Sequence, residues 1–121
     1  LLAAFAEFAA KIPEDGYLIG CGDDEHVRDI MNEVECNIIS FGLSDENDVY
    51  PENVTYDELG RARCQVMLFG QPMTELRLQV PGEYMLINAL AVLACTYTLG
   101  LDSHLVAEKL ATSPACTAAS S

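Results

Sequence analysis

Basic residues are scarce in this sequence of 121 residues. Six Lys and Arg stand against nineteen Asp and Glu, so the formal net charge at pH 7 is −13. Such a charge repels nucleic-acid backbones and anionic lipid surfaces. The sequence therefore argues against nucleic acid and membranes as partners, while a small local phosphate site remains compatible with it.

Motifs that hold metals, disulfides or phosphates are also missing. The five cysteines contain no Cys-x-x-Cys pair, and an odd number cannot all pair within one chain, so we expect reduced thiols as in a cytosolic protein. No G-x-x-x-x-G-K-[ST] motif occurs, which predicts that this chain has no phosphate cradle. The longest apolar run, over 80–100, is interrupted by Asn88, Thr96 and Thr98, which argues against a membrane span, and no signal-peptide pattern is found.

Strand and helix patterns alternate in the first third of the chain. YLIGCG over 17–22 and NIISFGL over 37–43 are short apolar segments typical of buried strands, with an amphipathic helix pattern over 25–34 between them. A helix pattern over 1–12 precedes them. Strand, helix and strand at this spacing predict a βαβ unit with a parallel sheet, hence an α/β fold with flanking helices.

The middle of the chain follows a different pattern. Three stretches over 49–58, 61–70 and 73–80 are separated by turn residues, and the last alternates as in a sheet with one solvated face. They predict a small three-stranded antiparallel sheet. Two helices should follow, one over 82–99 that ends at Gly100 and one over 103–112 that is capped by Asp102. We expect the small polar segment 113–121 to be frayed.

Two acidic residues follow the first buried strand, where α/β sheets place ligands. Asp23 and Asp24 can cap the next helix or contribute to catalysis, and capping is the favoured interpretation.

The histidines and the acidic loop have less specific patterns. His26 and His104 stand near helix starts without metal-ligand spacing, so both are interpreted as solvated helix-end residues. Asp45, Glu46 and Asp48 are interpreted as parts of a solvated loop.

Asn88 is unusual because it interrupts an apolar helix near its start. An amide removed from water costs free energy unless its donor and acceptor find partners. The helix begins after Pro81-Gly82, where a ligand can approach closely, and an amide suits the edge of a purine. The alternative is a bond from Asn88 to a neighbouring carbonyl or to water.

Several segments in combination resemble the Mur ligases. They are IPEDGYLIGCGDD, NIISFGL with SDENDVYPENVTYDELGR, and VPGEYMLINALAVLA followed by LGLD and VAEKL. Within the family, the resemblance is greatest to the branch that joins L-alanine to UDP-N-acetylmuramate. It extends over residues 1–112 and implies the later part of a central ATP-binding domain, with 113–121 as a tail outside the family pattern.

The resemblance implies an ATP-dependent amide ligase of peptidoglycan precursor synthesis in the bacterial cytoplasm. ATP and Mg²⁺ would be cofactors of the full-length enzyme, and a UDP-sugar would be a substrate. The family's phosphate loop and metal ligands belong to earlier sequence, so we expect no catalytic residue or metal ligand here, and neither activity nor tight cofactor binding from this chain alone. The family has the segment V-P-G-x-H-N-x-x-N-A-L-A, whose last asparagine lies near adenine, and Asn88 occupies that position here. Tyr84 and Met85 occupy the positions of the family's His-Asn pair and are the other cofactor-binding candidates.

Two alternatives stay open. The chain could be a non-catalytic acidic α/β binding or scaffold module derived from such a ligase, a hypothesis that Tyr84 and Met85 favour because they replace an imidazole and an amide. It could also belong to a sibling ligase that adds a peptide to the same sugar nucleotide or glutamate to folate.

Overall fold

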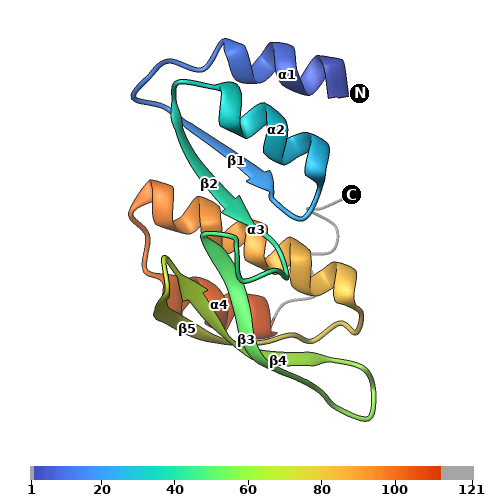
Figure 1. Cartoon of the computed structure of the whole chain (residues 1–121). Coiled ribbons are helices and arrows are strands. Elements are labelled where there is room, and N and C mark those ends of the chain that lie inside the picture. Colours follow the sequence, from blue (N-terminus) through green and yellow to red (C-terminus); the bar gives the residue numbers. More distant parts are fainter. Residues whose placement is uncertain (1, 113–121) are drawn as a thin grey trace.

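The N-terminal half of the fold is the predicted βαβ unit preceded by a helix. The computed structural model describes residues 2–112, so the predicted tail 113–121 lies outside the described residues. The elements are α1 (Leu2–Ala10), β1 (Tyr17–Cys21), α2 (Glu25–Glu33) and β2 (Asn37–Phe41), with β1 and β2 parallel. Figure 1 shows α1 and α2 side by side at the N-terminal end of the molecule.

The C-terminal half contains the predicted antiparallel strands and two helices. Its elements are β3 (Val49–Tyr56), β4 (Ala62–Leu68), β5 (Gln71–Arg77), α3 (Glu83–Leu99) and α4 (Ser103–Thr112). The third strand begins at Gln71, earlier than the sequence pattern predicts. A two-residue turn explains this, because Phe69 and Gly70 have φ angles of 50° and 79°, as tight hairpins require.

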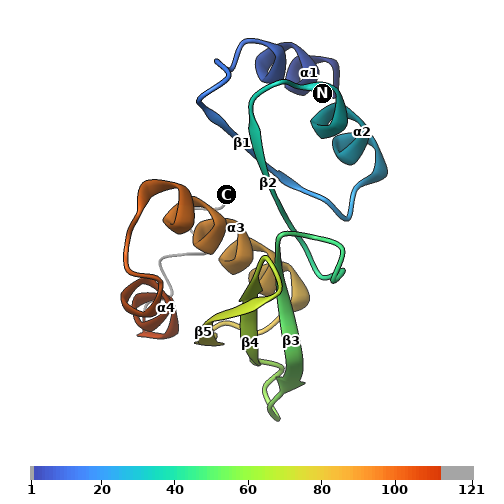
Figure 2. The ribbon, with the colours of Figure 1, turned by 60° about the vertical axis from the view of Figure 1, so that its left-hand side comes forward.

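The two sets of strands form one sheet in the order β1-β2-β3-β4-β5. The sequence predicted a parallel part and a separate antiparallel part, whereas the structure joins them through a single parallel pair, Phe41 and Val49. The backbone N–H of Gly42 also donates to the carbonyl of Val49 at 3.1 Å. Figure 2 shows the two parts of the sheet meeting at the end of β2.

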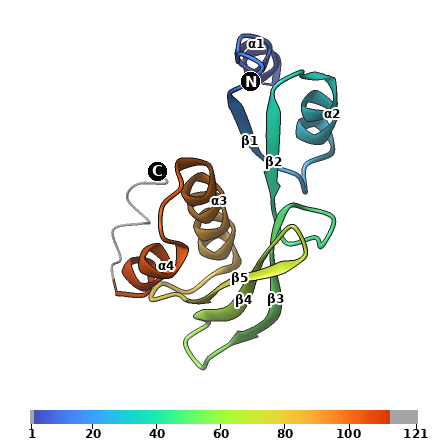
Figure 3. The same cartoon turned by 90° about the vertical axis from the view of Figure 1, so that its left-hand side faces the viewer.

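Two apolar cores lie on opposite faces of β1 and β2. The smaller core joins α1, β1 and α2 through Ala9, Leu18 and Met31. The larger core packs α3 and α4 against β2, β3, β4 and β5. Figure 3 shows α2 and α3 on opposite sides of these strands, which is the layered arrangement of an α/β domain.

Helix α3 is the central element of the larger core. Its residues Leu86, Leu90 and Leu93 are completely buried. The helix ends as predicted at Gly100, whose φ of 69° lies in the left-handed region. Helix α4 begins after Asp102, whose carboxylate accepts from the backbone N–H groups of the first turn, also as predicted.

Within 2–112, no helix combines the length and the apolar character that crossing a bilayer requires.

Candidate functional site

The start of α3 is held by backbone conformation rather than by a side-chain cap. Gly82 precedes the helix with a φ of 115°, a value that favours glycine, and no side chain caps this end. A Cβ added at Gly82 would meet no atom within 4 Å, so the space beside the helix start is open. The backbone N–H of Gly82 donates to the carbonyl of Gly60 at 3.2 Å, which ties the helix start to the turn before β4.

Asn88 lies one turn inside this helix with an unsatisfied amide. The side chain is half-buried, and its Nδ2 is buried without a hydrogen-bond partner among the described residues. A buried donor without a partner costs about 1–3 kcal/mol. Among the described residues Nδ2 therefore bonds no neighbouring carbonyl, which was the alternative, and because this atom is buried, a ligand can bond to it only after the side chain turns.

The three candidate cofactor-binding residues are separated by the helix geometry. Tyr84 lies four residues before Asn88 on the same side of α3, and 64% of its surface is exposed. Met85 is instead half-buried and packs against the larger core. An exposed aromatic ring and an unpaired amide on one helix face together suit a planar heterocycle, whereas Met85 can contribute mainly through packing.

The carboxylates after β1 are occupied by contacts within the chain. Asp24 caps α2, because its Oδ1 accepts from the backbone N–H groups of His26 and Val27 at 2.9 and 3.3 Å. This confirms the capping interpretation for Asp24.

The capping interpretation is wrong for Asp23, which bonds to the loop after β2 instead of to the start of α2. Its carboxylate accepts from the backbone N–H groups of Leu43 and Ser44 at 2.7 and 3.2 Å and from Nδ2 of Asn47 at 3.0 Å. It therefore binds the loop after β2 to the end of β1. Asn47 also accepts from Nη2 of Arg28 at 3.0 Å, so one buried amide joins α2, this loop and Asp23.

The prediction of a solvated acidic loop is correct for Asp45 and Glu46 and wrong for Asp48. Asp45 and Glu46 are exposed. Asp48 is half-buried, and its Oδ2 accepts from the backbone N–H and the hydroxyl of Ser40 at 2.9 and 3.3 Å. The difference arises because Asp48 directly precedes β3, where it links this strand to β2.

Both histidines lie exposed in the first turns of helices, as predicted. His104 has one specific contact, since its Nδ1 is 3.1 Å from the hydroxyl oxygen of Thr74. Among residues 2–112, no group of three or more His, Cys, Asp or Glu side chains could hold a metal ion.

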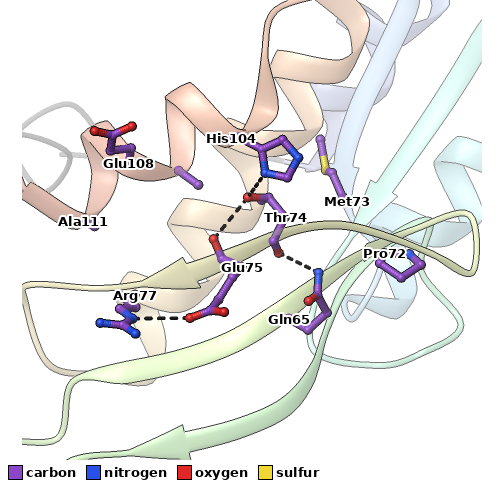
Figure 4. Close-up of a pocket in the computed structure, with 10 residues that line it drawn as sticks. Gln65, Pro72, Met73, Thr74, Glu75, Arg77, His104, Glu108 and Ala111 are labelled. Carbon is purple, nitrogen blue, oxygen red and sulfur yellow. Dashed lines mark hydrogen bonds and ion pairs between the residues drawn. The ribbon is translucent and has the colours of Figure 1, made fainter.

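A groove of about 560 Å³ lies between α4 and β5, away from the start of α3. Figure 4 shows His104 and Thr74 bonded across it, with Arg77 and Glu75 paired on the strand side. The alternation of the third strand predicted that Glu75 and Arg77 share one face but could not reveal the groove, because α4 forms its other wall.

The comparisons with known proteins agree on a family. The model of the Mur ligase middle domain matches residues 1–96. A UDP-N-acetylmuramate--L-alanine ligase of Clostridium tetani is 37% identical over 107 residues, which are 88% of this chain and 23% of that protein. The ligase of the same name from Acetivibrio thermocellus is 40% identical over 98 residues, 80% of this chain and 21% of that protein.

Solved structures share the fold. A UDP-N-acetylmuramoylalanyl-D-glutamyl-2,6-diaminopimelate--D-alanyl-D-alanyl ligase from Acinetobacter baumannii aligns with a TM-score of 0.78 and 23% identity over 93% of this chain and 24% of that chain. A UDP-N-acetylmuramate-alanine ligase from Thermotoga maritima aligns with a TM-score of 0.64 and 27% identity over 77% of this chain and 20% of that chain.

The chain spans less than a quarter of the length of these two curated relatives. Its match to the middle-domain model nevertheless covers most of its residues, and its identity to the curated ligases exceeds 30% over most of its length. The chain therefore belongs to the Mur ligase family and corresponds to part of the middle domain.

Proposed function

We propose that this chain is part of the ATP-binding domain of an ATP-dependent ligase that joins L-alanine to UDP-N-acetylmuramate. Support comes from the names of the relatives that are 37% and 40% identical to it. The full-length protein would use ATP and Mg²⁺ and act in the bacterial cytoplasm on a UDP-sugar, as an enzyme of peptidoglycan precursor synthesis.

The observation that carries the proposal is the unpaired amide of Asn88. A side-chain amide offers one donor and one acceptor, the pattern that pairs with the edge of adenine. Turning the amide about its terminal bond exchanges Nδ2 and Oδ1, so Asn88 can present either group to a base beside α3. Because Nδ2 is buried, a bound adenine would supply the hydrogen bond that it lacks among the described residues only after this turn.

Tyr84 and Met85 complete the proposed base site in different ways. The exposed ring of Tyr84 is available to stack on the base, and stacking of this kind contributes about 0.5–1.5 kcal/mol beyond burial of area. Met85 packs against the core and supports the first turn of α3 from inside. The chain would thus bind and orient the base of ATP, while other parts of the full-length polypeptide would bind the phosphates of ATP.

ATP, when bound, supplies the phosphoryl group that activates a carboxylate for attack by an amine. This chain lacks the Gly-rich phosphate loop, and the described residues contain no cluster suited to a metal ion. We therefore infer that the chain alone neither turns over substrate nor binds ATP tightly, because contacts to the base alone seldom outweigh the loss of translational and rotational entropy on association.

The test uses the full-length polypeptide that contains this segment. Asn88→Ala should raise KM for ATP by about tenfold, the effect of losing one or two hydrogen bonds, and should reduce the preference for ATP over ITP. Asn32→Ala, which removes an exposed amide from α2, is the matched control and should leave both quantities unchanged. An unchanged KM and an unchanged base preference in Asn88→Ala would contradict the proposed site.

A second test uses the chain alone. Millimolar Mg-ATP should leave its melting temperature unchanged. A clear stabilisation that disappears in Asn88→Ala would show that base contacts suffice for binding, and it would overturn the inference of weak binding.

The non-catalytic module remains a second candidate, favoured by Tyr84 and Met85 in place of the family's imidazole and amide. It requires no ATP turnover in the full-length polypeptide, so release of phosphate that depends on L-alanine and UDP-N-acetylmuramate would exclude it. Turnover with a different acceptor would instead identify a sibling ligase.

A further inference from the structure

Three of the six basic residues converge on one groove of the antiparallel sheet. A groove of about 540 Å³ is lined by Arg61, Arg63 and Arg77, and its lining contains one carboxylate, Asp57. In a chain with a net charge of −13, this is a local concentration of positive charge. It lies on β4 and β5 and the turn before them, apart from the start of α3.

The register of the sheet places two of these arginines directly opposite each other. Arg63 of β4 and Arg77 of β5 are cross-strand partners, and like charges in this position repel. A single carboxylate oxygen, Oε1 of Glu75, lies 3.2 Å from Nη2 of Arg63 and 3.3 Å from Nε of Arg77. Figure 4 shows the Glu75–Arg77 pair on the face of β5. The single negative charge of the Glu75 carboxylate is therefore shared between two guanidinium groups.

Most of the donor capacity of these arginines is unused. A guanidinium carries five N–H donors, and within residues 2–112 each of the two makes a single ion pair, with Glu75. Both side chains are more than half exposed, at 57% and 62%. Exposed ion pairs of this kind are weak and exchange readily with other anions.

The one carboxylate in the groove lining, Asp57, already accepts three hydrogen bonds. Oδ1 of Asp57 accepts from the backbone N–H groups of Leu59 and Arg61, both at 2.9 Å, and Oδ2 accepts from Nε of Arg61 at 2.7 Å. These hydrogen bonds, first among them the one from the Arg61 backbone, lower the pKa of Asp57 below its ordinary value. Asp57 thus holds Arg61 at the groove and keeps little capacity to neutralise Arg63 and Arg77.

From this juxtaposition we propose that the groove binds a doubly charged phosphate group between Arg63 and Arg77. Phosphate oxygens accept from two guanidinium groups at once, so a bound phosphate would displace Oε1 of Glu75 from Arg63 and Arg77, and its two negative charges match the two guanidinium charges. Arg61 and the exposed Tyr56 border the same groove and offer further donors to the ligand. The proposal is independent of the base site on α3.

The experiment titrates the 121-residue chain with inorganic phosphate, with glycerol phosphate and with acetate at matched ionic strength, followed by protein NMR shifts. Both phosphate ligands should bind saturably in the millimolar range, and acetate should not. Arg63→Gln and Arg77→Gln should each weaken phosphate binding about tenfold, the effect of losing a charge-assisted hydrogen bond. Tighter binding of glycerol phosphate than of inorganic phosphate would identify the ligand as a phosphate ester, and the reverse would identify the free anion.

Lys109→Gln is the matched control, because it removes an exposed cation from α4 outside the groove lining. The arginine variants should fold, since each removes one member of a like-charge pair, and circular dichroism checks this. Absence of saturable phosphate binding, or binding that is equally strong in Arg63→Gln, Arg77→Gln and Lys109→Gln, would overturn the proposal.

Discussion

Replacing Asn88 by leucine should stabilise the folded chain, although it removes the residue proposed to bind the base. Nδ2 of Asn88 is buried without a partner among the described residues, and such a donor costs about 1–3 kcal/mol. Leucine also has the better helix propensity, by about 0.5 kcal/mol. Because the side chain is only half-buried, we expect a net gain of about 1–2 kcal/mol in the free energy of unfolding, or roughly 4–8 °C in Tm for a chain of this size.

Urea and thermal unfolding followed by far-ultraviolet circular dichroism measure this gain. Asn47→Leu is the control, because that amide is 4% exposed and fully bonded to Asp23, Arg28 and the Ser44 carbonyl. It should destabilise the chain by about 2–4 kcal/mol, since it removes one hydrogen-bond partner each from Asp23, Arg28 and the Ser44 carbonyl. If Asn88→Leu destabilises the chain as Asn47→Leu does, the amide is satisfied in the folded state, and the argument for a base site at Asn88 fails.

Three further outcomes are expected from the geometry. Gly22→Ala should lower the free energy of unfolding by about 2 kcal/mol or more in urea titrations, because the added Cβ would overlap Oδ1 of Asn47. Burial raises the pKa of Cys64 from 9.0 to about 11, so the folded state holds this proton more tightly than the unfolded state does. The free energy of unfolding should therefore fall by up to about 3 kcal/mol as the pH rises from about 9 to 11. Cys64→Ala should remove this part of the dependence of stability on pH. On α3, Leu90→Ala should cost about 2–5 kcal/mol in the same titrations, whereas Leu99→Ala, at a side chain that is 71% exposed, should cost less than about 1 kcal/mol.

Local sequence patterns were sufficient for most of the elements. The individual strands and helices, the end of α3 at Gly100 and the cap at Asp24 are each indicated by residues within a few positions of one another. Hydrophobic spacing and capping chemistry act over this range, so they can be recognised without coordinates. The error at Asp48 has a different origin, because its partner Ser40 lies in β2, and this contact forms only when β2 and β3 come together.

The sequence by itself determined the α/β class, the family resemblance and the choice of Asn88 as the residue to explain. Tertiary structure alone decided that Nδ2 of this amide has no partner within residues 2–112, that Asp23 binds a loop some twenty residues away, and that Arg63 meets Arg77 across the sheet. The physical reason is the separation along the sequence over which each interaction acts. Helix and strand patterns express interactions between neighbours in the chain, whereas burial, strand register and the partner of a polar atom are set by segments that meet only after folding.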